Sequence, residues 1–221
     1  MKIDKKIPIY DVINIIEKEY KNWDVPVVTL VGMQTRNPFK VLISTIISLR
    51  TKDEVTIEAS KRIYKILTKP EDISNITIED IEKAIYPCGF YKRKAIQIKK
   101  ICEQLVKDFN SKVPDEIDTL LNFPGIGRKT ANLIVAEGHG KPAMCVDVHV
   151  HRISNRLGYL KSKNPEETEE ILRKNLNQEY WNRYNFLMVA FGQSLCRPIS
   201  PHCSKCPILN YCKRIDVKNH R

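Results

Sequence analysis

The sequence lacks an apolar run long enough to cross a bilayer. Its longest apolar stretch, from Val41 to Leu49, is interrupted by hydroxyl side chains and falls well short of the roughly 18 residues that a transmembrane helix needs. The N-terminus also lacks the apolar segment of a secretory signal, since Met1 to Lys6 are rich in charge. We therefore expect a cytoplasmic protein that makes no contact with membranes.

The sequence also lacks the cysteine pattern of a secreted, disulfide-bonded protein. Its seven cysteines are an odd number, and four of them lie within the last 26 residues, which indicates a metal site instead. The other three, Cys88, Cys102 and Cys145, are scattered, and we expect them to be buried thiols. Repeats, low-complexity tracts and long linkers are absent, so a chain of this length predicts one large domain or two small ones.

Positive charge is present in clear excess. Lys and Arg number 37 against 26 Asp and Glu, for a net charge of +11. A surplus of this size favours a polyanionic partner, because each neutralised phosphate releases counterions. Since membranes are excluded, we expect nucleic acid to be that partner.

Apolar residues recur at helical spacing almost throughout the chain. Short breaks, many with Pro or Gly, divide it into roughly ten helices, so we predict an all-α fold. Between Phe39 and Leu49 nearly every side chain is apolar, which predicts a helix surrounded by other helices. The acidic pairs Asp53-Glu54 and Glu79-Asp80 predict the first turns of two helices, where the helix dipole favours negative charge.

Four cysteines near the C-terminus are spaced C-x6-C-x2-C-x5-C, at Cys196, Cys203, Cys206 and Cys212. Four thiolates at this spacing can converge on one metal centre, and tetrahedral zinc and a cubane iron–sulfur cluster both fit them. Three prolines in the segment exclude a regular helix. Basic residues form a rim around the cysteines: Arg197, His202, Lys205, Lys213 and Arg214.

The segment from Leu120 to Ala131 has the pattern of a helix, a tight turn and a second helix. Gly125 and Gly127 stand where the backbone must turn sharply and approach something closely, and such a turn can offer N–H groups to a phosphate. An ordinary turn between helices fits the same pattern. In the first turn of the second helix, Lys129 meets a positive dipole and partial burial, which both favour a neutral, nucleophilic amine. A solvated or phosphate-contacting lysine is the alternative.

These two segments resemble the endonuclease III family, and the resemblance extends over nearly the whole chain. Family members carry a [4Fe-4S] cluster on cysteines at this spacing, which favours the cluster over zinc. They also carry a helix-hairpin-helix that contacts DNA, whose counterpart here is Gly125, Ile126, Gly127 and Arg128. Bifunctional members place their catalytic lysine where Lys129 stands.

The segment from Cys145 to Arg152 resembles the family's Val-Asp-x-His motif. This resemblance implies that Asp147, 18 positions after Lys129, is the catalytic aspartate. It also makes His149 a candidate for the substrate pocket. A helix N-cap aspartate and a helix-terminal histidine without chemistry are the alternatives.

Two loops depart from the family's residues. Arg50 stands where the family has a glutamine that fills the gap left by an extruded base, and Phe90 stands where it has a leucine that wedges between bases. A guanidinium can stack on or donate to an orphan base, and an aromatic wedge can offset lost stacking, so base flipping is still expected. A phosphate contact or salt bridge for Arg50 and a core position for Phe90 are the alternatives.

The resemblance implies a two-lobed all-α protein. A helical barrel at residues 31–141 would carry the hairpin, and residues 1–30 with 142–221 would form the cluster domain, with Lys129 and Asp147 meeting in a DNA cleft at the extruded nucleotide. The protein would act as a monomer, in the cytoplasm and associated with the nucleoid, on double-stranded DNA that contains damaged bases or abasic sites. It would remove oxidised pyrimidines and cut the strand by β-elimination.

Two other functions fit parts of the sequence. One is a monofunctional glycosylase for uracil or thymine mismatches, and Lys129 argues against it, because such relatives lack that lysine. The other is a non-catalytic hairpin protein with a structural metal, and Asp147 argues against it. An electron carrier fits poorly, because a hairpin motif and a +11 chain exceed what electron transfer requires.

Overall fold

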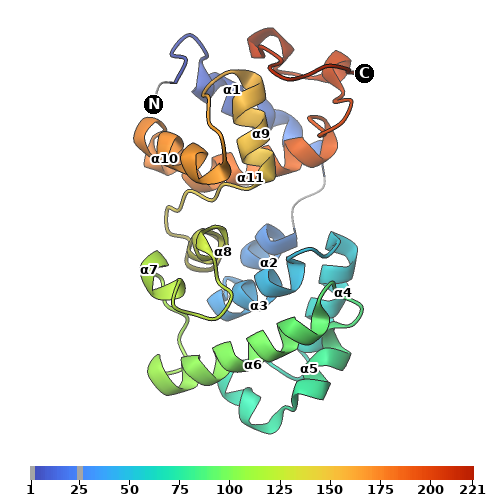
Figure 1. Cartoon of the computed structure of the whole chain (residues 1–221), viewed down its shortest axis with the longest axis vertical. Coiled ribbons are helices and arrows are strands. Elements are labelled where there is room, and N and C mark those ends of the chain that lie inside the picture. The colour runs from blue at the N-terminus through green and yellow to red at the C-terminus, as the bar shows by residue number, and fades with distance from the viewer. Residues whose placement is uncertain (1–2, 24–26) are drawn as a thin grey trace. The chain divides into compact units, whose positions relative to one another are not determined.

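The computed structural model describes residues 3–23 and 27–221. Within these residues the chain is helical, and its only extended pairing is a single bridge between Ile3 and Leu160 (Figure 1). Eleven α-helices are present in this part of the chain, which confirms the all-α prediction. None of the helices described is both long enough and apolar enough to cross a membrane.

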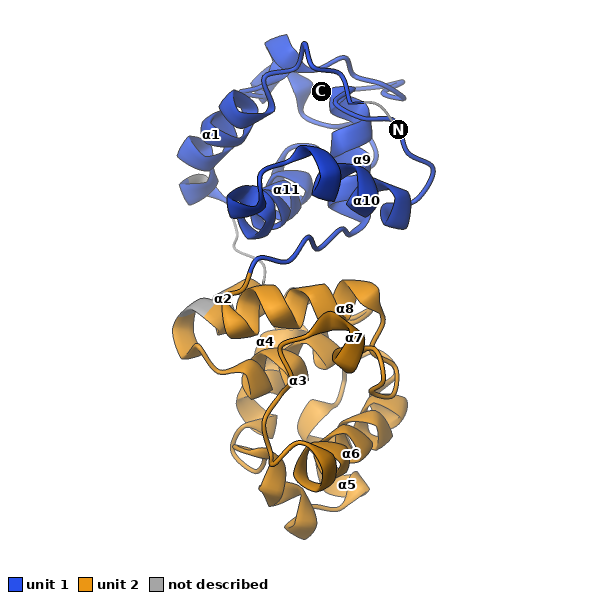
Figure 2. Cartoon of the chain, turned by 90° about the vertical axis from the view of Figure 1, so that its left-hand side faces the viewer, with its two compact units in different colours: residues 1–26, 142–221 blue, residues 27–141 orange. Residues whose placement is uncertain are grey.

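The chain divides into two compact units (Figure 2). We call residues 27–141 the central unit and residues 1–26 with 142–221 the terminal unit. The sequence placed the first boundary after residue 30, a position that falls inside helix α2 (Val27–Thr35). Because α2 packs against the next helix and against the turn after α8, the whole of α2 belongs to the central unit.

The central unit holds seven α-helices in the described residues. After α2 come α3 (Pro38–Ser48), α4 (Asp53–Ile63), α5 (Ile78–Ile85), α6 (Tyr91–Asp108), α7 (Ile117–Leu120) and α8 (Arg128–Leu133). A 3-10 helix, Pro70–Asn75, separates α4 from α5, and one turn of π-helix, Ile134–Gly138, continues α8. The connections are short, so each helix packs against its neighbours.

Helix α3 forms the centre of this unit, as its apolar sequence predicts. The side chain of Asn37 caps its first turn by accepting hydrogen bonds from Phe39 N and Lys40 N, at 2.9 and 3.2 Å. Every residue from Val41 to Ile47 is buried. Packing against α2, α4, α6 and the π turn covers α3 on all sides. An apolar helix of this kind is stable only when it is enclosed.

The two acidic pairs lie in first turns, as predicted. Asp53 begins α4, and Glu79 and Asp80 lie in the first turn of α5. At α5 the side chain of Thr77 accepts a hydrogen bond from Asp80 N, and Asp80 Oδ2 accepts one from Thr77 N, both at 3.1 Å. This reciprocal capping satisfies two N–H groups that have no partner within the helix.

The terminal unit contains the remaining four α-helices of the described chain. They are α1 (Ile9–Glu19), α9 (Val148–Leu157), α10 (Pro165–Asn175) and α11 (Trp181–Ser194). Short 3-10 turns occupy Tyr20–Asn22, Gln178–Tyr180, Cys203–Lys205 and Leu209–Tyr211. Helix α11 packs against α1 and α9 around one apolar core. Residues after Ser194 form loops and short turns, as the prolines predict.

The π turn after α8 carries a carboxyl group in an unfavourable environment. The side chain of Glu137 accepts one hydrogen bond from Thr29 Oγ1 at 3.1 Å, and burial raises the pKa of this carboxyl above its usual range. The close approach of α2 explains the burial, because a Cβ added at Gly32 would lie 2.7 Å from the Glu137 carbonyl oxygen. Burying the charged form is costly, and one hydroxyl offsets only part of that cost.

We expect Glu137→Gln to raise the melting temperature at pH 7. A raised folded-state pKa means that the stability of the wild type is fully present below the unfolded pKa, near pH 4, and is lost as pH rises through the folded pKa. The amide avoids this loss, because it carries no charge and still accepts from Thr29. Thermal melts between pH 3.5 and 8 measure the difference, which should vanish at the acid end.

The matched control is Glu170→Gln, at an exposed position of α10. It should shift the melting temperature little at any pH in this range. A Glu137→Gln variant that is less stable than the wild type at pH 7 would contradict this account of Glu137.

Candidate functional site

The predicted hairpin is present in the central unit. Helix α7 ends at Leu120, the turn runs to Gly127, and α8 begins at Arg128. The side chains of Leu120, Phe123 and Ile126 are buried, and they anchor the turn to the rest of the unit. The side chain of Ile126 therefore faces the protein core, and its N–H closes the turn by donating to the Phe123 carbonyl at 3.2 Å.

The two hairpin glycines have different roles. Gly125 has a left-handed φ of +70°, and a Cβ there would lie 2.7 Å from Gln97 Nε2, so the fold itself requires glycine. Gln97 Nε2 also donates to the Pro124 carbonyl at 2.9 Å, which holds the turn against α6. Gly127 is extended, with φ −94°, and a Cβ there would meet no atom within 4 Å. The free protein thus has no steric need for glycine at position 127.

Lys129 lies in the first turn of α8, directly after the hairpin, as predicted. Its side chain is exposed, so the expectation of partial burial is wrong. The next three residues of α8, Thr130, Ala131 and Asn132, are buried, so the helix enters the core directly after Lys129. Gly125, Gly127 and Arg128 are exposed on the same short segment.

Asp147 lies in the terminal unit and caps helix α9. Its Oδ1 accepts hydrogen bonds from His149 N at 2.8 Å and from Val150 N at 2.9 Å. The residue is only 8% exposed. The N-cap alternative therefore describes the structure correctly. It is compatible with a chemical role, because these bonds hold the carboxyl group in one orientation.

His149, in the first turn of α9, packs closely against α11. A Cβ added at Gly192 would lie 2.4 Å from His149 Nδ1. The Arg152 guanidinium lies one turn further along α9, with Nη2 at 3.1 Å from His149 Nδ1. The same Nη2 donates to the Cys196 carbonyl at 2.8 Å and to the Gly192 carbonyl at 3.3 Å. Arg152 therefore connects the helix of Asp147 to the first cysteine of the cluster motif.

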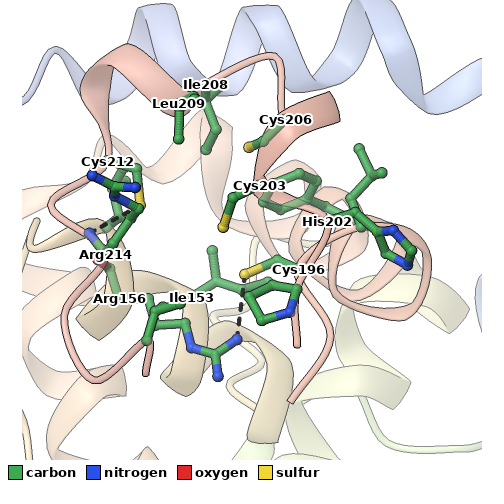
Figure 3. A pocket seen from close by; sticks show the side chains of 15 residues that line it. Ile153, Arg156, Cys196, His202, Cys203, Cys206, Ile208, Leu209, Cys212 and Arg214 are labelled. Carbon is green, nitrogen blue, oxygen red and sulfur yellow. Dashed lines mark hydrogen bonds between the residues drawn. The ribbon is translucent and has the colours of Figure 1, made fainter. Parts of the chain in front are cut away.

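The four cysteines of the motif surround one cavity, shown in Figure 3. Cys203 is buried and Cys196, Cys206 and Cys212 are half-buried, whereas the three scattered cysteines are all buried, as expected. Apolar side chains form most of the remaining wall: Ile153, Leu157, Phe191, Leu195, Ile208 and Leu209. Among the described residues, no three His, Cys, Asp or Glu side chains are placed to hold a single metal ion. The four cysteines therefore line a shared cavity and do not meet at one point.

The surroundings of the cysteine sulfurs suit an anionic metal group. Arg156 Nη1 donates to Cys196 Sγ at 3.7 Å, and Arg214 N donates to Cys212 Sγ at 3.4 Å (Figure 3). Burial raises the pKa of the Cys206 thiol to about 12 and raises the pKa of Cys203 and Cys212 as well. Thiolates in such a place need positive charge nearby, which metal ions supply. The residues present therefore fit the cluster.

Arg156 also fixes the segment that carries the first two cysteines. Its guanidinium donates to the Arg197 and Pro198 carbonyls, each at 2.6 Å. Four of the five residues in the basic rim, Arg197, Lys205, Lys213 and Arg214, are exposed, and His202 is partly exposed. The cysteine segment thus combines the hydrogen bonds of its own turns with bonds from Arg152 and Arg156 of α9.

The loops of Arg50 and Phe90 lie together in the central unit. The Arg50 guanidinium carbon is 5.5 Å from the centre of the Phe90 ring. Both residues have a left-handed backbone, with φ of 53° and 57°, a conformation that costs an L residue roughly 1–2 kcal/mol. Phe90 is 55% exposed, so its core alternative is wrong, and Arg50 is exposed as well.

Two basic residues at these sites were not singled out from the sequence. Lys94 is 5% exposed and reaches the end of α3 from α6, and Arg152 reaches the cysteine segment from α9. The sequence contains a pattern that could have identified Lys94. It shares the buried face of α6 with Ala95, Ile98 and Ile101, so a lysine stands at a core position of the helical pattern.

Comparison with known proteins supports a common origin for these features. A profile of the family described as HhH-GPD superfamily base excision DNA repair protein matches residues 43–178. Endonuclease III of Thermotoga maritima is 45% identical over 177 residues, which cover 80% of this chain and 83% of that protein. Endonuclease III of Bacillus subtilis is 33% identical over 178 residues, covering 80% and 81%.

Solved structures agree with the sequence relatives. The structure of a trapped endonuclease III–DNA covalent intermediate, an estranged-adenine complex, matches with a TM-score of 0.84 and 33% identity, over 96% of this chain and 97% of that one. A thermostable thymine-DNA glycosylase matches with a TM-score of 0.81 at 24% identity, over 93% and 95%, a likeness of fold alone. From the family profile, the sequence relatives and the fold together, this chain belongs to the endonuclease III family, within the HhH-GPD superfamily.

Proposed function

We propose that this protein is a bifunctional DNA glycosylase and abasic-site lyase of base excision repair that removes oxidised pyrimidines from duplex DNA. The observation that carries the proposal is an exposed lysine, Lys129, in the first turn of the helix that follows the glycine hairpin. Family membership supports it, because the relatives are endonuclease III proteins. A lysine at this place would carry its amine beside a turn that binds DNA, within reach of a nucleotide.

In the proposed reaction, Asp147 accepts a proton from Lys129, and the neutral amine attacks C1′ of the damaged nucleotide. The bond from C1′ to the base breaks, and the base leaves with the electron pair and takes up a proton. Opening of the sugar gives a protonated imine with Lys129, which acidifies the C2′ proton. Loss of that proton drives β-elimination, in which the 3′ phosphate leaves.

The capping geometry of Asp147 suits this role. Two backbone N–H groups fix one carboxyl oxygen, so the group is oriented before substrate binds. A carboxylate held near the sugar stabilises the positive charge that develops there as the base departs. We propose that Lys129 of the central unit and Asp147 of the terminal unit act on one nucleotide, with the two units as the domains of the family fold.

We propose that Cys196, Cys203, Cys206 and Cys212 hold a [4Fe-4S] cluster. The shared cavity, the N–H donors at two sulfurs and the positive charge nearby all support a polynuclear anionic group. Such a group supplies a rigid cross-link between four points of a loop-rich segment. The segment's exposed basic side chains would then be held in place to contact the DNA backbone.

The DNA contacts follow from the same proposal. The hairpin, at Gly125, Ile126, Gly127 and Arg128, would bind a phosphate, with Gly125, Gly127 and Arg128 exposed, while Arg50 and Phe90 would enter the duplex beside the extruded nucleotide. His149 would line the pocket for that nucleotide. We propose that the protein works as a monomer in the cytoplasm, at the nucleoid, on DNA with damaged bases or abasic sites.

We expect Gly127→Ala to weaken DNA binding about tenfold, or ~1.4 kcal/mol, without a loss of folding stability. The added methyl group meets nothing in the free protein, so it can only obstruct a phosphate that approaches the backbone. Fluorescence anisotropy titrations at several salt concentrations measure the affinity, which should also fall steeply with salt.

Gly125→Ala provides the contrast, because its left-handed backbone and the nearby Gln97 amide predict a loss of stability of about 1 kcal/mol. If Gly127→Ala binds as tightly as the wild type, the hairpin does not contact phosphate in the proposed way. A flat plot of log affinity against log salt would remove the electrostatic argument.

We expect protein prepared without oxygen to be brown and to contain iron and acid-labile sulfide. Cys206→Ser should lose most of the metal, since one of four ligands is removed. Cys102→Ala is the control, because Cys102 is a buried cysteine on α6 of the central unit, outside the motif, and it should keep the metal. One zinc ion per chain without iron or sulfide would show that the cluster assignment is wrong.

We expect borohydride to trap a covalent cross-link between Lys129 and a duplex that contains an oxidised pyrimidine or an abasic site. Lys129→Gln should abolish the cross-link and still bind DNA, because only one of 37 positive side chains is removed. Lys107→Gln removes the same charge from an exposed position of α6 and should cross-link normally. Peptide mapping of the trapped species identifies the attached residue.

Asp147→Asn should bind DNA but react about 10²-fold more slowly, since it loses the proton acceptor. Asparagine caps helices as well as aspartate does, so α9 should be intact. If the wild type releases bases without ever cross-linking, the monofunctional function is correct. If it neither releases bases nor cross-links on any lesion, the protein is a non-catalytic DNA-binding protein.

A further inference from the structure

Lys94 has an unusual environment for a lysine. It lies in the first turn of α6 and is buried, and its ammonium donates three hydrogen bonds. Two go to the carbonyls of Ile47 and Leu49, at 2.7 and 2.6 Å, and the third goes to Thr51 Oγ1 at 2.9 Å. An ammonium has three donors, so its hydrogen-bonding capacity is used completely.

The three acceptors lie where α3 ends and the Arg50 loop begins. Carbonyls in the last turn of a helix have no partner within that helix, and a positive charge there is favourable. Helix α3 ends at Ser48. Lys94 takes the place of a C-terminal cap for α3, and it holds the backbone before Arg50 and the side chain of Thr51 after it.

Thr51 extends this connection to the second loop. Besides the bond from Lys94, its Oγ1 accepts a hydrogen bond from Gly89 N at 3.2 Å. The backbones of the two loops also touch, because a Cβ added at Gly89 would lie 2.5 Å from the Arg50 carbonyl oxygen. Gly89 directly precedes Phe90, which is the N-cap residue of α6. Lys94 and Thr51 therefore join the two loops by their backbones.

The result is a pair of exposed side chains on a buried polar support. Arg50 and Phe90 both have left-handed backbones, and their side chains contact each other at the surface. Left-handed conformations of residues other than glycine persist only where the surroundings hold them. Burial lowers the pKa of Lys94, so the charge is disfavoured by its site and is retained through its hydrogen bonds. Apolar packing alone would not require an ammonium group at this position.

We propose that Lys94 is a positioning residue that binds the Arg50 and Phe90 loops into one rigid element, so that both side chains enter the duplex together. The inference rests on the proposed function, in which these two side chains occupy the opened duplex. Lys94 itself does not touch DNA in this scheme. It acts through the backbone of Arg50 and, by way of Thr51, through the backbone at Gly89.

The test compares Lys94→Met with the wild type on DNA that must be opened and on DNA that is already open. The first readout is the fluorescence of 2-aminopurine placed opposite a non-cleavable abasic analogue, which rises when the base loses its stacking. The second is the rate of borohydride cross-linking to an abasic site, measured in a paired duplex and in the same single strand. Only the duplex requires the two loops.

We expect Lys94→Met to lose most of the fluorescence rise at saturating protein. Its cross-linking rate should fall at least tenfold on the duplex and change less than twofold on the single strand. Thr51→Val is a second variant of nearly the same shape, and it removes the bridge to Gly89 while Lys94 keeps both carbonyls. It should lower the duplex rate selectively and less severely, and it decides the question alone if Lys94→Met does not fold.

Lys92→Met is the matched control. It removes the same charge from an exposed position in the same turn of α6, so the ratio of duplex to single-strand rates should be unchanged. If Lys94→Met lowers both rates by the same factor, Lys94 serves the fold alone and the proposal is overturned. Unchanged rates and fluorescence would overturn it as well.

The two readouts separate this inference from the proposed chemistry. Fluorescence reports opening of the duplex and does not depend on Lys129. If the wild type opens the duplex without cross-linking, the lyase function is removed, and loss of the fluorescence rise in Lys94→Met would still support the role of Lys94. A wild type that produces no fluorescence rise would overturn the role of Lys94, whatever its chemistry.

Discussion

Carbonyl groups at the end of a helix have no partners within that helix, and this constraint shapes both units of the protein. In each unit a basic side chain from a different helix supplies the missing donors. Lys94 of α6 binds the carbonyls at the end of α3. Arg152 and Arg156 of α9 bind carbonyls at and beyond the end of α11, from Gly192 to Pro198.

The segments held in this way are the ones to which function is assigned. The end of α3 leads into the Arg50 loop, and the end of α11 leads into Cys196 and the rest of the cysteine segment. Loops and short turns lack the regular hydrogen-bond ladder of a helix, so bonds from a neighbouring helix restrict their motion. A cation fixed by the packing of its own helix gives such a loop one conformation, which is what a binding site requires.

Asp147 combines a structural role with the chemical role that we propose for it. Asp147 caps α9 and holds a carboxyl group in place with the same two hydrogen bonds. Within the hairpin the roles divide instead, since Gly125 provides the left-handed turn and Gly127 leaves the backbone open to a ligand. The two glycines of one motif thus have different roles, one in the fold and one at the surface.

Local features were predictable because they depend on residues close together in the chain. Helical periodicity, the apolar pattern of α3, the first turns at Asp53 and Glu79, the hairpin and the cysteine spacing are all of this kind. The exposure of side chains was harder to predict. Lys129 was expected to be partly buried and is exposed, whereas the exposure of Phe90 agrees with the wedge that was predicted for it.

The sequence by itself determined the helical class, the ends of several helices and the residue types that carry the proposed chemistry. Tertiary structure alone decided which side chains support them. Lys94 binds partners that lie 43 to 47 positions away along the chain, and Arg152 reaches a carbonyl 44 positions away. Such pairs produce no periodic pattern in the sequence. A hydrogen bond to a backbone carbonyl depends on the path of the chain in the fold, and every residue type offers the same carbonyl group.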